Sequence, residues 1–234
     1  MNNANRHQDM LIKVASALGV ELCQQMTFVG GCTTGLLLTD EFTREQVRHT
    51  DDVDLIIHVL SYALYTKLQE RLRGRGFREI IDASDDPICA MQLGELRVDF
   101  MPDNEGILGF SNCWYKDALI NADDYNLTSE ITIRLVKPVY FVATKLEAYL
   151  GRGNNDPLAS RDIEDLLNLF DGREELIKEI EQSSPELQKF IAVQLSALLD
   201  NSDFDYAVQS CSLGDAGREK LIFERLEQIA RGRK

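Results

Sequence analysis

The sequence predicts an α/β domain followed by an all-helical domain. Short apolar runs of strand length alternate with helical patterns up to about residue 137, as is typical of α/β folds. From Pro138 onward, apolar residues recur at helical spacing instead. The chain has 234 residues, 44% of them hydrophobic, which is enough to bury a core in one large or two moderate domains. We therefore expect a first domain over residues 1–137 and a second over 138–234.

The first domain begins with apolar residues at helical spacing over 8–19, and Gly19 is a suitable stop. The run MTFVGG at 26–31 predicts a short strand, and CTTGLLLT at 32–39 predicts a helix directly after its two glycines. Residues 40–49 are charged and loop-like. Further strands are expected at 52–59, 77–81, 87–93, 96–102 and 131–138, together with a helix at 61–76 that is capped by Ser61.

The second domain contains amphipathic helices and no strand pattern. Apolar residues recur three and four positions apart in each of its segments, which places them on one helix face. The sequence contains no internal repeat and no low-complexity linker. The expected helices cover residues 139–152, 160–170, 173–182, 185–199 and 217–230.

The formal net charge of −14 disfavours broad binding to nucleic acid, which depends on neutralising phosphates. We therefore expect no DNA partner. Two local basic stretches remain, RLRGRGFR at 71–78 and RGRK at 231–234. Each is a candidate phosphate-binding patch or simply a solvated helix end, where cations complement the helix dipole.

No apolar stretch approaches the roughly 20 residues that cross a bilayer. The first ten residues, MNNANRHQDM, are polar and carry no signal-peptide pattern. We therefore expect a cytoplasmic protein with no membrane partner. The five cysteines are odd in number and form no CxxC motif, so reduced thiols are expected instead of a disulfide framework or a structural zinc site.

Acidic residues open one apolar strand, in the stretch RHTDDVDLIIHV at 48–59. Residues i and i+2 of a strand share a face, so Asp52 and Asp54 lie side by side, roughly 6–7 Å apart. Carboxylates this close repel each other, and a divalent cation such as Mg²⁺ removes the conflict. Asp99 lies near the end of another apolar strand, so three carboxylates meet if the strands are neighbours. The pair alone is weak support for a metal, because surface strands often carry it.

The preceding strand strengthens the metal hypothesis. It ends in Gly30 and Gly31 and is followed by the expected helix. Glycines allow a phosphate to approach the backbone, and a helix N-terminus offers free N–H groups. A phosphate cradle followed by three carboxylates is typical of metal-assisted nucleotidyl transfer.

These stretches together resemble a known superfamily. VGG before a helix, then RHTDDVDL, then RVDF, is similar to the nucleotidyltransferases that include DNA polymerase beta. The form Arg-x-Thr-x-Asp-Val-Asp-Leu, from Arg48 to Leu55, looks like the AbiEii/MenT branch of toxin nucleotidyltransferases, as does the stretch from ATKLEAYLGRG to SRDIEDLLNLFDGR. The matching blocks run from about residue 27 to 173. The resemblance implies an α+β nucleotidyltransferase fold with a mixed sheet in the first domain.

The resemblance also implies the role of each site residue. Asp52, Asp54 and Asp99 would bind two Mg²⁺ ions, and Asp99 would also accept the proton of the attacking hydroxyl. The phosphates of the NTP substrate would lie on the glycines and on nearby polar groups, and Asp162 would be a catalytic-site residue. The implied nucleotide-binding residues are Gly30, Gly31, Thr33, Arg48, Thr50 and Lys145.

Some of these residues have an ordinary structural alternative, and the sequence departs from its relatives. Lys145 could be a surface lysine whose stem packs on apolar residues, and Asp162 could simply complement a helix dipole. Cys32 stands where many relatives have serine, so Thr33 or backbone N–H groups must bind phosphate instead. Arg152 is a weaker phosphate candidate in a flexible loop, and TDEFTREQV at 39–47 is expected to be a surface excursion.

Three functions remain open on the sequence alone. The first is a toxin that adds NMP to tRNA 3′ ends and is neutralised by an antitoxin protein. The second is an aminoglycoside-type enzyme, which suits the acidic surface because opposite charge steers a cationic substrate. The third is a catalytically idle module that binds nucleotide or a protein partner.

Overall fold

The computed structural model of the chain describes residues 2–80 and 88–232. The predicted strands at 77–81 and 87–93 therefore each extend one residue outside the described part, and Arg233 and Lys234 of the basic C-terminal stretch lie outside it. The chain divides into two compact units. The first contains Met1–Thr33 and His49–Lys137, and the second contains Thr34–Arg48 and Pro138–Lys234.

The first unit is built around a mixed sheet, as the resemblance implied. In its described residues, strands follow the spatial order β3-β4-β5-β2-β1-β7-β6. β2 and β5 are parallel, as are β1 and β7, whereas the other neighbouring pairs are antiparallel. The strands are β1 (Met26–Val29), β2 (Asp52–Ile57), β3 (Arg78–Glu79), β4 (Ala90–Leu93), β5 (Leu96–Pro102), β6 (Asp123–Asn126) and β7 (Thr132–Leu135).

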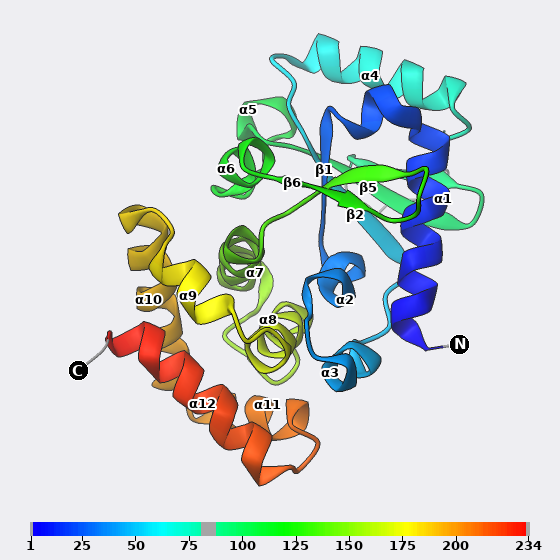
Figure 1. Cartoon of the computed structure of the whole chain (residues 1–234). Helices are drawn as coiled ribbons and strands as arrows, with labels where there is room; N and C mark the ends of the chain where they lie inside the picture. The colour runs from blue at the N-terminus through cyan, green and yellow to red at the C-terminus, as the bar shows by residue number, and fades with distance from the viewer. Residues whose placement is uncertain (1, 81–87, 233–234) are drawn as a thin grey trace. The chain divides into compact units, whose positions relative to one another are not determined.

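Helices pack on the centre of this sheet. The helices of the first unit are α1 (Asn3–Cys23), η1 (Gly31–Thr33), α4 (Tyr62–Gly74), α5 (Glu105–Leu108) and α6 (Tyr115–Ile120). Both α1 and α6 contact β1 and β2, and they flank β1 on its two sides (Figure 1). All four residues of β1 are consequently buried, because a strand covered on both faces has no solvent side.

Two predicted helices differ from the observed ones. Gly19 interrupts the first helix as expected, with a non-helical φ of +70°, but helical residues resume after this kink, so α1 extends to Cys23. The helix expected at 32–39 is a 3₁₀ turn, η1, followed by only four α-helical residues in α2 (Thr34–Leu37). Three threonines and Gly35 in this stretch disfavour a longer helix.

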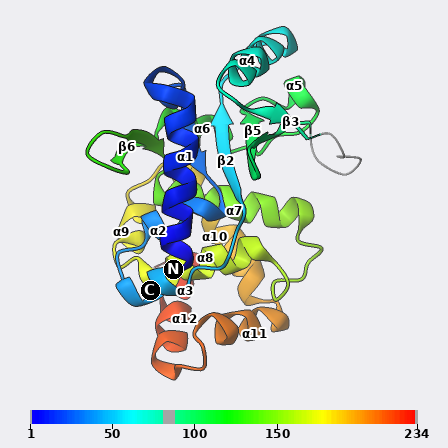
Figure 2. The same ribbon diagram turned by 90° about the vertical axis from the view of Figure 1, so that its right-hand side faces the viewer.

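The second unit is helical in its described residues, as expected for the C-terminal part. Ser160 and Ser184 cap α8 and α10 by accepting hydrogen bonds from backbone N–H groups three residues on. α11 and α12 lie next to each other in both views (Figures 1 and 2). Besides α2, this unit contains α3 (Glu41–Gln46), α7 (Pro138–Arg152), α8 (Arg161–Gly172), α9 (Leu176–Glu181), α10 (Pro185–Leu199), α11 (Ser202–Cys211) and α12 (Ala216–Arg231).

Residues 34–48 belong to this helical unit and not to the sheet unit. The sequence predicted a charged loop at 40–49, which is wrong over Glu41–Gln46, where helix α3 forms. Most residues of the predicted surface excursion at 39–47 are exposed, but the segment is anchored to the helical unit. Asp40 caps α3 by accepting a hydrogen bond from the Thr43 backbone N–H, and α3 packs on α8. Thr43 and Val47 are buried. The charged residues at 40–46 gave no local sign of this contact, because their partners are polar groups of α8 and α12, which lie far along the chain.

None of the helices in the described part of the chain is both long and apolar enough to cross a membrane.

Candidate functional site

The expected site residues fall into both units. The first unit contains Gly30, Gly31, Thr33, Thr50, Asp52, Asp54 and Asp99, and the second contains Arg48, Lys145 and Asp162. Within each unit, the structure brings most of these residues into contact with one another or with a shared partner.

In the first unit, three carboxylates share one face of the sheet. β2 and β5 are parallel neighbours, with Asp54 opposite Asp99 and Asp52 opposite Arg97. Because residues two apart on a strand point to the same face, all four side chains lie on the same side of this strand pair. Adjacent strands are roughly 4.8 Å apart, so the three carboxylates start from neighbouring backbone positions, as a shared metal site requires.

The turn after β1 lies against Asp54. Val29 pairs with Asp54 across β1 and β2, and Gly30 follows with φ of +76°. A Cβ atom on Gly30 would lie 1.8 Å from Oδ2 of Asp54, so a residue with a side chain cannot occupy this position while Asp54 keeps its place. Gly30 thus lets the backbone pass directly beside the carboxylate.

The same turn is closed by Thr33. Its hydroxyl donates to the carbonyl oxygen of Gly30 over 2.8 Å, and its backbone N–H donates to the same oxygen over 3.1 Å. Gly31 and Thr33 are both buried. The argument from a helix dipole at this turn does not apply, because a dipole needs aligned peptide groups over several turns. Any phosphate binding here would therefore depend on individual backbone groups.

Thr50 holds the first carboxylate. Its hydroxyl donates a hydrogen bond to Oδ1 of Asp52, and the Thr50 side chain is buried just ahead of β2. Asp52 itself is only half-buried, so it keeps access to solvent on this side. The structure thus gives Thr50 a contact with a carboxylate, whereas the resemblance implied that Thr50 would steady the triphosphate or the loop.

Arg97 is a site residue that the sequence reasoning did not identify. Its guanidinium binds both carboxylate oxygens of Asp99, with Nε–Oδ1 of 2.9 Å and Nη2–Oδ2 of 3.0 Å. The available signal was its spacing, since residues 97 and 99 share one face of a strand. This bidentate pair gives the buried Asp99 a counter-charge within its own strand.

The carboxylates fit Mg²⁺ in part. Their oxygen atoms are the donors that Mg²⁺ prefers, and the Asp54 carboxylate lies directly against the backbone of Gly30. However, among residues 2–80 and 88–232 no three His, Cys, Asp or Glu side chains are grouped closely enough to bind a metal ion. Asp52 and Asp54 are therefore the fitting pair, and Asp99 would have to exchange Arg97 for the metal.

In the second unit, Lys145 is the centre of a buried ion-pair network. It lies on α7, and its Nζ is 2.7 Å from Oδ2 of Asp165 and 3.2 Å from Oδ1 of Asp162, both on α8. Burial lowers the pKa of Lys145, but the two carboxylates raise it more, so the pKa lies above its ordinary value. Lys145 is therefore a protonated core cation in this structure and not a surface lysine.

Two arginines complete this network. Arg48 binds both oxygens of Asp165, and Arg152 binds both oxygens of Asp162, with distances between 2.8 and 3.0 Å. Burial raises the pKa of Asp162, but the hydrogen bond from Arg152 and the charge of Lys145 lower it below its ordinary value. Arg152 was expected in a flexible loop, but it is the last residue of α7 and bound to Asp162.

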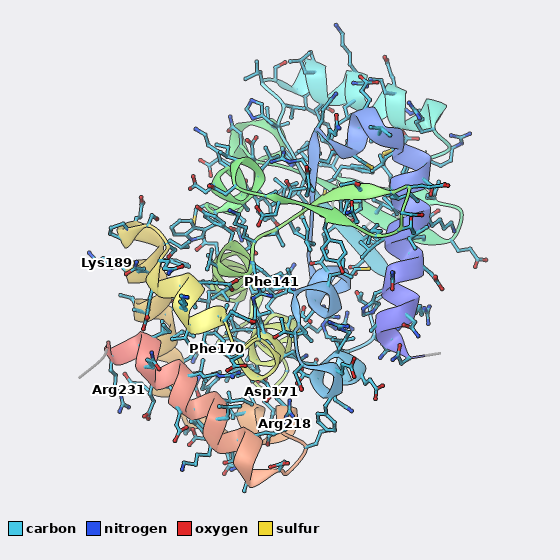
Figure 3. The ribbon with its side chains drawn as sticks, in the orientation of Figure 1. Phe141, Phe170, Asp171, Lys189, Arg218 and Arg231 are labelled. Atoms are coloured by element: carbon cyan, nitrogen blue, oxygen red, sulfur yellow. The ribbon has the colours of Figure 1, made fainter. Side chains whose placement is uncertain are left out.

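The sequence reasoning missed Asp165, although it joins Arg48 to Lys145. The signal was present, because Asp162 and Asp165 are three positions apart and so share one face of α8. The sequence reasoning also missed a second ion-pair cluster, which is centred on Arg218. Arg218 of α12 binds Asp171 of α8 and Asp40, over 2.6 and 2.8 Å. Figure 3 shows Arg218 and Asp171 next to each other.

The basic stretch at 71–78 is largely engaged in surface contacts. Arg71 pairs with Glu21 over 2.8 Å, and Arg73 pairs with Glu79 over 2.5 Å. Arg78 donates to the carbonyl oxygens of Arg73 and Phe77. These pairs are exposed and weak, but they reduce the positive charge that this patch can offer to RNA.

Comparison with protein-family models gives no matching family, and comparison with curated proteins gives no significant match.

Proposed function

We propose that this chain is a Mg²⁺-dependent nucleotidyltransferase that moves NMP from an NTP to an acceptor hydroxyl and releases pyrophosphate. The observation that supports this most strongly is the alignment of Asp54 with Asp99 on neighbouring parallel strands, with Asp52 on the same face. The close approach of the Gly30 backbone to Asp54 provides further support, because it brings backbone groups that would contact phosphate next to a metal-binding carboxylate.

In this proposal Asp52 and Asp54 hold Mg²⁺, and Asp99 joins them when Arg97 releases it. Bound metal would neutralise charge on the triphosphate and act as a Lewis acid. Asp99 would accept the proton of the acceptor hydroxyl, and Thr50 would keep the Asp52 carboxylate in place. Backbone groups of Gly30 and Gly31, with Thr33 closing their turn, would contact phosphate oxygens.

The resemblance assigns Arg48 and Lys145 to the triphosphate and Asp162 to the catalytic centre. In the structure, each of these residues has a buried ion-pair partner within the helical unit. Their contribution to stability must therefore be measured separately from their contribution to activity.

For the acceptor, we propose a tRNA 3′ end, with the protein acting as the toxin of a toxin–antitoxin pair. The AbiEii/MenT-like stretch around Arg48 supports this choice. A small cationic acceptor of the aminoglycoside type is the second candidate. The net charge of −14 and the ion pairs of Arg71 and Arg73 favour it, because both weaken attraction for RNA.

The test incubates the purified protein with Mg²⁺ and each α-labelled NTP, against total tRNA and against an aminoglycoside panel. Asp54→Asn should lower transfer by at least about 100-fold, since metal stabilisation of the transition state amounts to several kcal/mol. Asp124→Asn is the matched control, because it removes the same charge from an exposed position on β6 and should leave transfer unchanged.

Label on tRNA supports the toxin proposal, and label only on aminoglycosides replaces it with the second candidate. If NTP binds without transfer to either acceptor, a protein acceptor or an idle nucleotide-binding module remains. Equal Mg²⁺-dependent NTP binding by wild type and Asp54→Asn, measured by calorimetry, would refute the metal assignment itself.

A further inference from the structure

His7 lies in the apolar face of α1, where a buried polar side chain requires hydrogen-bond partners. His7 is 2% exposed and shares this face with Leu11, Val14 and Leu18, which are fully buried. Its position continues the helical spacing of the apolar residues. The structure uses it for hydrogen bonding as well as for packing, and its partners lie at the carboxylate strand and at the glycine turn.

The imidazole of His7 binds the residue that holds Asp52. Nε2 of His7 accepts a hydrogen bond from the backbone N–H of Thr50 over 3.3 Å. An accepting Nε2 carries no proton, so this contact assigns the neutral tautomer with the proton on Nδ1. The Thr50 hydroxyl in turn donates to Asp52. One chain of hydrogen bonds therefore runs from α1 to the first carboxylate.

The backbone of His7 also contacts the glycine turn. Sγ of Cys32 donates to the carbonyl oxygen of His7 over 3.6 Å, and both residues are buried. α1 packs on η1 and on β2. His7 is thus bound through its carbonyl oxygen to Cys32, in the turn beside Asp54, and through its imidazole to Thr50, two residues ahead of Asp52.

We propose that His7 is a positioning residue, which fixes Thr50 and through it the carboxylate of Asp52. The role as a positioning residue for catalysis rests on the proposed nucleotidyl transfer, but the hydrogen-bond chain itself does not. The effect depends on an acceptor atom at the Nε2 position. It does not depend on the volume of the ring, and this difference makes the proposal testable.

Three variants separate these roles. His7→Leu fills similar space but has no acceptor, whereas His7→Gln places an oxygen close to the position of Nε2. Leu18→Ala opens a cavity on the same helix face, far from Thr50, and controls for lost stability. His7→Leu should lower kcat on the order of 100-fold with KM for NTP nearly unchanged, because small misplacements of reacting groups are costly. His7→Gln should restore most of kcat, and Leu18→Ala should leave kcat unchanged below its melting temperature.

A second measurement is independent of activity. In His7→Leu, the Thr50 amide proton should exchange with solvent at least about 10-fold faster, and the carboxyl carbon resonance of Asp52 should shift. His7→Gln should leave both as in wild type. Absence of transfer by the wild type would refute the proposed function, and the NMR data would still decide whether His7 positions Asp52. Equal behaviour of the Leu and Gln variants, or an unchanged Asp52 resonance in His7→Leu, would overturn the inference.

Discussion

Nζ of Lys145 lies 2.7 Å from Oδ2 of Asp165 in the interior of the helical unit, and the two side chains are 7% and 1% exposed. A buried pair of this kind contributes little relative to an apolar pair of the same size, but removing one partner is strongly destabilising. A residue expected to bind phosphate is therefore also part of the core of its unit.

Lys145→Met should reduce the free energy of unfolding by about 3 kcal/mol, because it leaves two buried carboxylates with one cation fewer. The expected loss is at the lower end of the usual range, since Arg48 and Arg152 still bind these carboxylates. Urea unfolding followed by circular dichroism measures it. Lys178→Met removes an exposed lysine of α9 and should cost at most about 0.5 kcal/mol. Equal stability of the two variants would show that Lys145 is not needed as a counter-charge.

Gly30→Ala should displace the Asp54 carboxylate, because the added Cβ would lie 1.8 Å from its Oδ2. The control is Gly109→Ala, which has a similar φ of +82° but no atom within 4 Å of the added Cβ. Both variants carry the same backbone strain, so the difference isolates the clash, at about 1–3 kcal/mol of unfolding free energy. Calorimetry should also find weaker Mg²⁺-dependent NTP binding in Gly30→Ala alone. Wild-type binding by this variant would mean that Asp54 has room to rearrange.

Arg218→Met should loosen residues 34–48 from the other helices of the helical unit. Arg218 binds Asp171, whose side chain is 4% exposed, and also binds Asp40 and Thr43. We expect a loss of about 3 kcal/mol, because Asp171 would remain buried without its cation. Trypsin should then cleave faster after Arg44 in α3. Lys220→Met, which breaks only an exposed pair with Glu224, should cost about 0.5 kcal/mol or less and leave cleavage unchanged.

Asp40 should make this contact sensitive to acid. Hydrogen bonds from the Thr43 hydroxyl and from Arg218 lower the pKa of Asp40 from 3.8 to about 2. A lowered pKa in the folded state means that Asp40 contributes stability above pH 4 and loses the contribution as the pH falls toward 2. Asp40→Asn should therefore be less stable than wild type at pH 6, and the difference should shrink between pH 4 and pH 2. A difference that stays constant over this interval would exclude ionisation as its cause.

Elements with a regular local pattern were predictable from the sequence. The strand at 96–102 and the helix at 185–199 have the expected bounds, because alternation in one and a serine cap with proline in the other are local signals. The pattern at Asp123–Asn126 is not apolar, since this strand is exposed at the sheet edge, and it was missed. In the same way, α11 was missed because acidic residues interrupt its apolar spacing.

The candidate site was less predictable than the fold. The face shared by Asp52 and Asp54 follows from strand geometry alone. The contacts of Asp52 and Asp54 with distant parts of the chain do not follow from strand geometry, because these contacts depend on which strands and helices become neighbours. Arg97 contacts Asp99 within β5, and the spacing of two residues was a local signal for this pair. His7 contacts Thr50 through the packing of α1, and this contact leaves no signal in the local sequence.

The position of residues 34–48 has a consequence for how the chain acquires its structure. Thr43 and Asp171 are 128 positions apart, yet Arg218 binds both of them. During synthesis, α3 leaves the ribosome long before its binding surface on α8 exists, so this contact must form late and after closure of a large loop. A chain cut to residues 138–234 would lack α2 and α3 and would expose the end of α8. We therefore expect the helical half to fold poorly when expressed alone and to recover when residues 34–48 are supplied as a separate peptide.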